Sequence, residues 1–323
     1  MRTRMKTPLD AAETAGAAGD SATPAGRSPW GLVLDRLRTN RAAMTGLGIV
    51  IFFLVVALAA PLLTTLSGWD PAQPDKTAID ANLAGMPRGA LGGIGAEHWL
   101  GVEPVSGRDI FSRIVQGARV SLFIAFTSAA VVMVLGTVFG IAAGYFGGWV
   151  DTVISRLIDL LMSFPGLIFM IAIMAVTPDV DRIVLLIAVI GFFSWPGIAR
   201  IVRGETLSVK RREFVDAART SGARDHRILL KEILPNVSGP IIAYATLLVP
   251  GLISAEAALS FLGIGIRPPT PSWGEMLSNA VTYYQVDPMY FVIPSLCLFL
   301  VVLGFSLLGD GLRDAIDPKG ARK

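Results

Sequence analysis

The sequence predicts an all-α, polytopic membrane protein with six transmembrane helices. Of its 323 residues, 53% are hydrophobic and 16% are charged, whereas about a quarter of the residues in a soluble domain are charged. The mean hydropathy of +0.60 also indicates a chain surrounded by lipid. Six apolar stretches reach or approach the ~20 residues that a helix needs to cross a bilayer. They run over Ala42–Leu66, Ser121–Phe146, Leu160–Thr177, Ile183–Ala199, Val237–Ala255 and Tyr290–Gly309.

Lys and Arg are distributed unevenly among the connecting segments. If the N-terminus is cytoplasmic, the inner segments hold seven, one, nine and four of these residues, which makes 21 of the 28 in the chain. These inner segments are residues 1–41, 147–159, 200–236 and 310–323. Because cytoplasmic loops are enriched in Lys and Arg, both termini are expected in the cytoplasm. The same bias explains the basic pI near 9.2 without a nucleic-acid partner.

The distribution of residue types along the chain predicts its domain organisation. Residues 1–29 are rich in Ala, Gly, Thr, Ser and Pro and show no periodicity, which is typical of a disordered tail. The other divisions are a region with the first helix, an extracytoplasmic segment, a core of five transmembrane helices and a cytoplasmic C-terminal tail, over residues 30–66, 67–116, 117–310 and 311–323. In the second helix Gly136, Gly140 and Gly144 share one face, which predicts tight packing against a neighbouring helix.

The longest inner segment between helices, residues 200–236, is the most informative part of the sequence. Its apolar spacing predicts two short amphipathic helices joined by Gly222, which supplies the left-handed residue that ends a helix. Asp225 is expected to cap the second helix, and Pro235 is expected to end it. The two apolar faces consist of Phe214, Ala217, Ala218 and Ser221, and of Leu229, Leu230, Ile233 and Leu234.

Two functions fit such a hairpin. A small apolar face ringed by charges suits a groove on a partner protein. A basic amphipathic hairpin also suits anionic lipid head groups. The residues alone leave both functions open.

Four residues within the helices are candidates for lining a pathway or for locking the bundle. They are Trp195, Pro196, Glu256 and Ser260. An ionisable group such as Glu256 inside an apolar stretch is a functional candidate, because an unpaired charge in lipid is costly. An interhelical hydrogen bond or salt bridge is the more ordinary role for it. Trp195 and Pro196 mark either a kink or, more simply, aromatic anchoring at a membrane interface.

The segment 200–236 resembles the EAA loop of ABC-importer permeases. The resemblance is carried by Asp216-Ala217-Ala218, Gly222 and Leu234-Pro235, with Asp216 in place of the usual Glu and Glu232 where an apolar residue is often found. In that family the loop's short coupling helix docks into a cleft on a cytoplasmic ATPase subunit. The resemblance therefore implies a coupling site composed of Glu213, Phe214, Asp216, Ala217, Ala218, Gly222, Leu234 and Pro235.

Other motifs are similar to one branch of that family, the C-type permease subunits of dipeptide, oligopeptide and nickel importers. They appear in the same order as in that branch, from about residue 36 to residue 318. Among them are His98-Trp99-Leu100-Gly101, Gly107-Arg108-Asp109, Phe164-Pro165-Gly166, Trp195-Pro196, Ala255–Gly263, Pro271-Ser272-Trp273-Gly274 and Asp317-Pro318.

The resemblance implies the type I ABC importer permease fold and a subunit that moves di- or oligopeptides across the bacterial cytoplasmic membrane. The implied partners are a homologous permease subunit, two cytoplasmic ATPase subunits and an extracytoplasmic solute-binding protein, within membrane lipid. Arg108, Asp109 and Arg113 either contact that binding protein or make local salt bridges. Because the sequence lacks the phosphate loop G-x-x-x-x-G-K-[ST], ATP and Mg are expected on the partner subunits, with no catalysis and no cofactor on this chain.

Metal binding has little support in the sequence, since His98 and His226 lie far apart and Cys297 is the single cysteine. An importer of the same build for nickel, its chelates or glutathione is the first alternative function. The second is a non-ABC secondary transporter, which would place several ionisable groups near the membrane midplane. The lone Glu256 near a helix end counts against that class.

Overall fold

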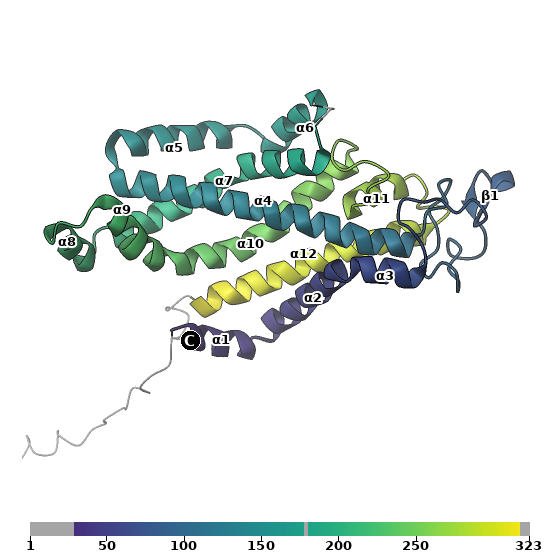
Figure 1. Ribbon diagram of the computed structural model, residues 1–323, viewed down its shortest axis with the longest axis horizontal. Helices are drawn as coiled ribbons and strands as arrows, with labels where there is room; N and C mark the ends of the chain where they lie inside the picture. The colour runs from purple at the N-terminus through teal and green to yellow at the C-terminus, as the bar shows by residue number, and fades with distance from the viewer. Residues whose placement is uncertain (1–28, 178–179, 317–323) are drawn as a thin grey trace, which may run out of the picture.

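The computed structural model describes residues 29–177 and 180–316, and these residues form a bundle of long helices lying side by side (Figure 1). The longest are α2 (Arg41–Leu58), α4 (Ile110–Phe146), α7 (Arg182–Val209), α10 (Leu234–Phe261) and α12 (Pro288–Ile316). The short helix α8 (Glu213–Thr220) lies at one end of the bundle and strand β1 (Ile79–Asp80) at the other. These two ends are called the α8 end and the β1 end below.

Five helices in the described residues are long and apolar enough to cross a membrane, and a bent pair of helices raises the number to six if it counts as one span. That pair is α5 (Gly148–Ser163) and α6 (Gly166–Val176), which meet at an angle of 82°. The predicted all-α membrane fold is therefore confirmed. The single helix predicted over Leu160–Thr177 was wrong, however. Pro165 lacks an N–H and restricts Phe164 to an extended conformation, with φ −106° and ψ 147°, so the helix breaks there.

Other helix boundaries also differ from the sequence prediction, since α7, α10 and α12 continue to Val209, Phe261 and Ile316. Helix α4 begins at Ile110 rather than Ser121, because Asp109 caps it by accepting a hydrogen bond from the Ser112 N–H at 2.7 Å. The apolar pattern missed this start because the charged Arg113 lies in the first turns. The first predicted helix is divided into α2 and α3 (Ala60–Ser67), with a proline in the first turn of α3.

The remaining elements are short. They are α1 (Pro29–Thr39), a 3-10 helix (Ala81–Leu83), β2 (Met86–Pro87), α9 (Asp225–Ile228), a π-helical turn (Leu229–Ile233) and α11 (Trp273–Ala280). Strands β1 and β2 pair antiparallel, with Ile79 opposite Pro87. Of the two predicted tails, residues 1–28 and 317–323 lie outside the described residues, and residues 311–316 form the last turn and a half of α12.

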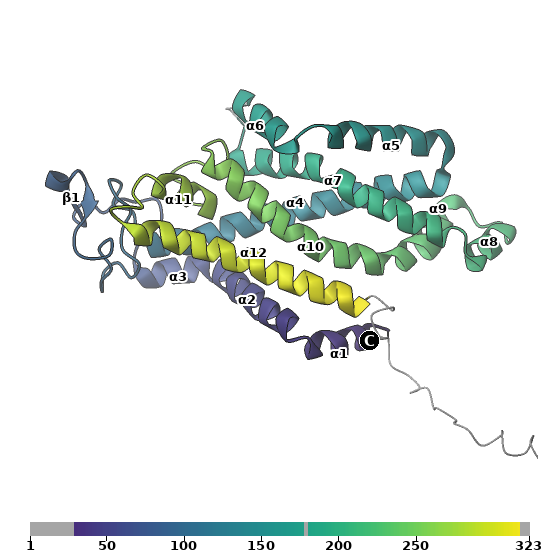
Figure 2. The ribbon, with the colours of Figure 1, turned by 180° about the vertical axis from the view of Figure 1, so that it is seen from behind.

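The most extensive helix contact joins α4 to α7, which lie side by side (Figure 2). The glycine face of α4 lies in this contact. A Cβ atom on Gly140 would lie 2.7 Å from the Ala199 carbonyl oxygen and 2.7 Å from Val202 Cβ. At Gly136 and Gly144 a Cβ would likewise lie under 3 Å from atoms of α7. Only glycine permits this approach, so the predicted role of the glycine face in tight packing is confirmed.

A buried network of charges holds the β1 end together around Arg113, whose side chain is fully buried. Its Nε pairs with Glu103 Oε1 at 2.5 Å and its Nη2 with Glu275 Oε2 at 2.7 Å. Its Nη1 also donates to the carbonyl oxygens of Pro71 and Pro269, at 3.0 and 3.1 Å. One guanidinium thus joins α4, α11 and two loops that are far apart in the sequence.

The other two charged residues of the outer motif are also engaged locally. Arg108 Nε donates to Glu103 Oε2 at 2.8 Å. The buried carboxylate of Asp109 lies 2.9 Å from His98 Nδ1, and the His98 ring stacks on Trp69. Of the two roles considered for Arg108, Asp109 and Arg113, the structure supports local salt bridges.

Candidate functional site

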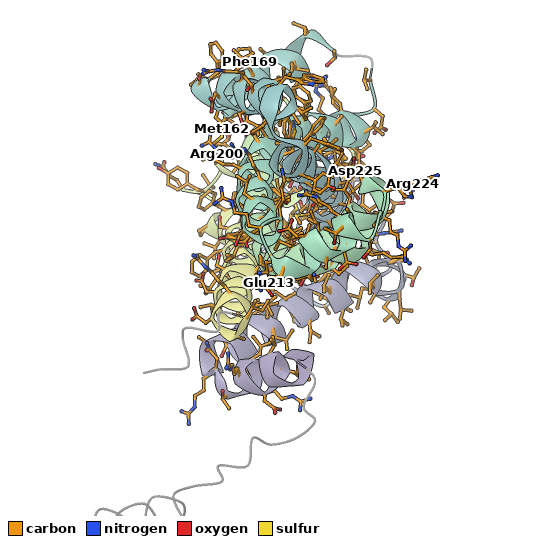
Figure 3. The ribbon with its side chains drawn as sticks, turned by 90° about the vertical axis from the view of Figure 1, so that its left-hand side faces the viewer. Met162, Phe169, Arg200, Glu213, Arg224 and Asp225 are labelled. Atoms are coloured by element: carbon orange, nitrogen blue, oxygen red, sulfur yellow. The ribbon has the colours of Figure 1, made fainter. Side chains whose placement is uncertain are left out.

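The predicted coupling residues lie at the α8 end, where α8 crosses the ends of the long helices (Figure 3). Glu213 begins α8, and Arg224 and Asp225 follow its far end. Beneath α8 and α9 is a buried apolar cluster to which four parts of the chain contribute. Its buried members are Tyr145, Val209, Val215, Ile228, Ile233 and Val237. Helix α8 therefore rests on a packed base that belongs to the bundle.

The residues of α8 divide into an inner and an outer face. Val215 is fully buried, and Phe214 and Ala218 pack partly against the same cluster. Asp216 and Ala217 are exposed. The predicted apolar face of Phe214, Ala217, Ala218 and Ser221 is therefore split, because Val215, which lies outside that predicted face, anchors the helix instead.

Gly222 makes the turn after α8 that the sequence predicts. Its φ is +79°, in the left-handed region. The N–H of Gly222 donates to the Arg219 carbonyl at 2.9 Å, and the N–H of Ala223 donates to the Ala218 carbonyl at 3.0 Å. These two bonds form a Schellman motif, which satisfies the last carbonyls of a helix. The turn also borders a shallow hollow of about 300 Å³, lined by Ala218, Ser221, Gly222, Ala223, Arg227, Ile228 and Glu232.

Asp225 does not cap the second helix as predicted. It occupies the first position of α9 rather than the capping position, and its Oδ1 accepts a hydrogen bond from the Tyr145 hydroxyl at 2.6 Å. Tyr145 lies in the last turn of α4 and is 4% exposed. No local sequence pattern points to Tyr145, because it stands at the end of an apolar stretch, far along the chain from its partner.

Pro235 also differs from the prediction, since it does not end a helix. Residues Asp225–Phe261 form one continuous helical segment. Just before Pro235 the backbone widens into a π-helical turn, in which the Leu234 N–H donates to the Leu229 carbonyl five residues earlier. Such a turn provides room for a proline ring that would clash with the preceding turn of a regular helix. Leu234 and Pro235 therefore begin α10 at the base of the hairpin.

Two ion pairs brace α7 against α5 near the hairpin. Arg203 binds Asp151 with both its Nε and its Nη2, at 2.5 and 2.7 Å. Arg200 Nη2 lies 3.0 Å from Asp159 Oδ1, on a more exposed part of the same surface. Within the described residues, no group of three or more His, Cys, Asp or Glu side chains is arranged to hold a metal ion.

The other candidate residues lie inside the bundle, away from α8. Glu256 and Ser260 are fully buried in α10, and the Ser260 hydroxyl donates to Glu256 Oε1 at 2.8 Å. The hydroxyls of Ser121 on α4 and Ser272 before α11 lie beside the same carboxyl. The Ser260 bond lies within α10, and Glu256 Oε2 has no hydrogen-bond partner among the described residues, so the bundle-locking role considered for Glu256 stays a prediction.

Trp195 and Pro196 have a different environment from the one expected. Trp195 is 2% exposed, and its ring packs against Phe139 with 4.8 Å between the ring centroids. A side chain in this position does not anchor the protein at a membrane interface, so that interpretation was wrong. Pro196 is also buried, and α7 continues through it.

Comparison with known proteins identifies the family. The family described as binding-protein-dependent transport system inner membrane component matches residues 136–322. The N-terminal TM domain of oligopeptide transport permease C matches residues 28–85. Among solved structures, an inward-facing MetNI methionine ABC transporter aligns with a TM-score of 0.51 at 20% identity, over 64% of this chain and 96% of the other. That likeness shows the fold.

Curated relatives are similar over most of the chain. The dipeptide transport system permease protein DppC of Alkalihalophilus pseudofirmus is 40% identical over 293 residues, which is 90% of each chain. The glutathione transport system permease protein GsiD of Escherichia coli is 40% identical over 294 residues, which is 91% of each chain. The protein belongs to the family of binding-protein-dependent transport system inner membrane components, in the branch that carries the N-terminal domain of oligopeptide transport permease C.

Proposed function

We propose that this chain is one permease subunit of an ATP-driven importer of di- or oligopeptides in the bacterial cytoplasmic membrane. Its partners are a homologous permease subunit, two cytoplasmic ATPase subunits and an extracytoplasmic solute-binding protein. ATP and Mg bind to the ATPase partners, and this chain contributes a gated path and a mechanical link. The observation that carries the proposal is the geometry of α8: Asp216 and Ala217 are exposed, while Val215 is buried in the apolar cluster beneath the helix. The chain is also 40% identical to a dipeptide and a glutathione permease.

The proposed orientation places the α8 end in the cytoplasm. Nine of the 28 Lys and Arg residues lie in residues 200–236, which include α8 and α9. Enrichment in basic residues is typical of cytoplasmic loops. In this orientation the exposed Asp216 and Ala217 face the solution where ATPase subunits reside, and the β1 end faces the binding protein.

The proposed coupling step is a displacement of α8 by the ATPase. Closure of the ATPase dimer on ATP pulls the helix, and the apolar base under Val215 transmits that movement to the long helices. Because packed interiors deform little and switch between discrete arrangements, a shift at α8 changes how the bundle closes. Hydrolysis then resets the complex.

Glutathione is the second candidate cargo, since GsiD is as similar to this chain as DppC is. Glutathione is itself a tripeptide, so both cargoes belong to one chemical class. The solute-binding protein is expected to decide between them, since it meets the cargo first.

Purification of the tagged chain from its native membranes in mild detergent tests the proposal. A second permease, ATP-binding subunits and a solute-binding protein should co-purify and be identified by mass spectrometry. The ligand released from that binding protein identifies the transported substrate. A chain that purifies alone and still transports would contradict the proposal.

A further inference from the structure

We infer that Tyr145 is the positioning residue that ties α8 and α9 to α4, so that a displacement of the hairpin moves α4. The inference deepens the proposed function and rests on it. Tyr145 belongs to the last turn of α4, which ends at Phe146, and its side chain is 4% exposed. It lies in the buried cluster beneath the hairpin.

Three separate segments contact this one residue. The Tyr145 hydroxyl donates to Asp225 Oδ1 on α9 at 2.6 Å. The guanidinium carbon of Arg219 on α8 lies 5.3 Å from the centroid of the Tyr145 ring. Lys210, just after α7, places its ammonium 5.7 Å from the same centroid and donates to the Tyr145 carbonyl. Both cations are within the distance at which an aromatic ring attracts a cation.

The chemistry of these contacts differs from that of the apolar base around them. Apolar contacts are non-directional, so the apolar base can transmit a displacement but does not by itself fix the orientation of the hairpin on α4. A short hydrogen bond to a carboxylate has a fixed geometry and is stronger than a neutral one. Asp225 begins α9 directly after the Gly222 turn, so this bond fixes the far side of the hairpin to the end of α4.

Helix α4 is suited to carry a displacement across the bundle. Its 37 residues extend for ~55 Å at 1.5 Å per residue. It packs against α7 along the glycine face, where Gly136, Gly140 and Gly144 leave no room for even a methyl group. At its other end are Arg113 and the buried charge network. A shift imposed at Tyr145 therefore reaches the β1 end through a stiff, closely packed element.

The test uses the whole complex, purified with and without the trapped nucleotide MgADP-vanadate, and measures hydrogen–deuterium exchange. In the wild type, trapping is expected to change exchange both at α8–α9 (residues 213–228) and in the segment that leads into the first turn of α4 (residues 103–113). Tyr145→Phe keeps the ring and its cation contacts and removes only the bond to Asp225. Loss of a hydrogen bond to a charged group corresponds to a change of roughly tenfold or more in a population. The response at residues 103–113 should therefore fall to about a tenth or less, while the response at 213–228 persists.

Two further variants distinguish positioning from a general loss of packing. Asp225→Asn retains an oxygen that accepts from the Tyr145 hydroxyl, so it should preserve more of the response than Asp225→Ala. If the two residues act through one bond, Tyr145→Phe should add little to Asp225→Ala, since effects of residues in one contact are not additive.

Each remaining outcome separates this inference from the proposed function. If trapping changes nothing at 213–228 in the wild type, the proposed coupling at α8 fails. Suppose that trapping changes exchange at residues 213–228 of the wild type. If exchange at residues 103–113 then does not change, or changes as much in Tyr145→Phe as in the wild type, the role of Tyr145 is overturned and the proposed function stands.

Discussion

Arg113→Leu is expected to lower the free energy of unfolding by about 3–5 kcal/mol, the range for removing one partner of a buried ion pair. The substitution leaves Glu275 buried without a cation and also removes the donors to the carbonyls of Pro71 and Pro269. Because whole domains are stable by only ~5–15 kcal/mol, most of the variant should be lost from the membrane or melt at a much lower temperature. Thermal unfolding in detergent measures the effect.

Arg200→Leu is the matched control. It removes the same kind of side chain from an ion pair with Asp159 in which both side chains are 54% exposed. Exposed pairs contribute about 0–1 kcal/mol, so this variant should melt close to the wild type. Equal losses in the two variants would contradict the importance assigned to the buried network.

The Arg113 defect should also depend on pH. Burial raises the pKa of Glu275 from 4.5 to about 7, and the charge of Arg113 opposes that rise. A carboxyl whose pKa is higher in the folded state than in the unfolded state favours folding when protonated, and that contribution is lost as pH rises from about 4.5 through the folded-state pKa. Without the charge of Arg113 the pKa of Glu275 should be higher still, so the loss of folding stability with rising pH should extend above pH 7. The gap in melting temperature between Arg113→Leu and the wild type should therefore narrow from pH 8 to pH 5.

Gly222→Val should reduce uptake about tenfold while the ATPase subunits continue to hydrolyse ATP. A side chain with a Cβ costs roughly 1–2 kcal/mol in the left-handed region, and 1.4 kcal/mol is a factor of ten in an equilibrium. Within the part of the chain that the structure describes, no heavy atom outside the turn lies within 4 Å of the position of a Cβ at Gly222, so the strain is confined to the backbone of the turn. The fold and membrane insertion should therefore survive. Uptake and ATP hydrolysis are measured together in reconstituted vesicles.

Gly222→Asn provides the control for that experiment, because asparagine adopts the left-handed region more readily than other non-glycine residues. It should recover much of the uptake that Gly222→Val loses. Normal uptake by Gly222→Val would show that the turn after α8 is not needed for coupling.

The sequence was sufficient to predict the elements whose signal is local. Long apolar runs predicted the membrane helices, and the spacing around Gly222 predicted the turn. Features that depend on distant partners were missed. The early start of α4 requires Arg113 to be neutralised by Glu103 and Glu275, and neither pairing is visible in an apolar pattern.

The same limitation explains the errors at the candidate site. Asp225 looks like a capping residue until Tyr145, from a different helix, supplies its hydrogen bond. Pro235 looks like a helix end unless the π-helical turn before it is known. Trp195 resembles an interfacial anchor in sequence, and only its contact with Phe139 places it in the core.

Photo-crosslinking from α8 in whole cells tests directly whether this helix docks on an ATPase subunit. A benzoylphenylalanine at the exposed Ala217 should form an adduct with an ATP-binding subunit. The same probe at Leu83, which is 62% exposed at the β1 end, should form none with that subunit. If the probe at Ala217 reacts only with lipid, α8 rests on the membrane surface, and its role as the coupling helix is contradicted.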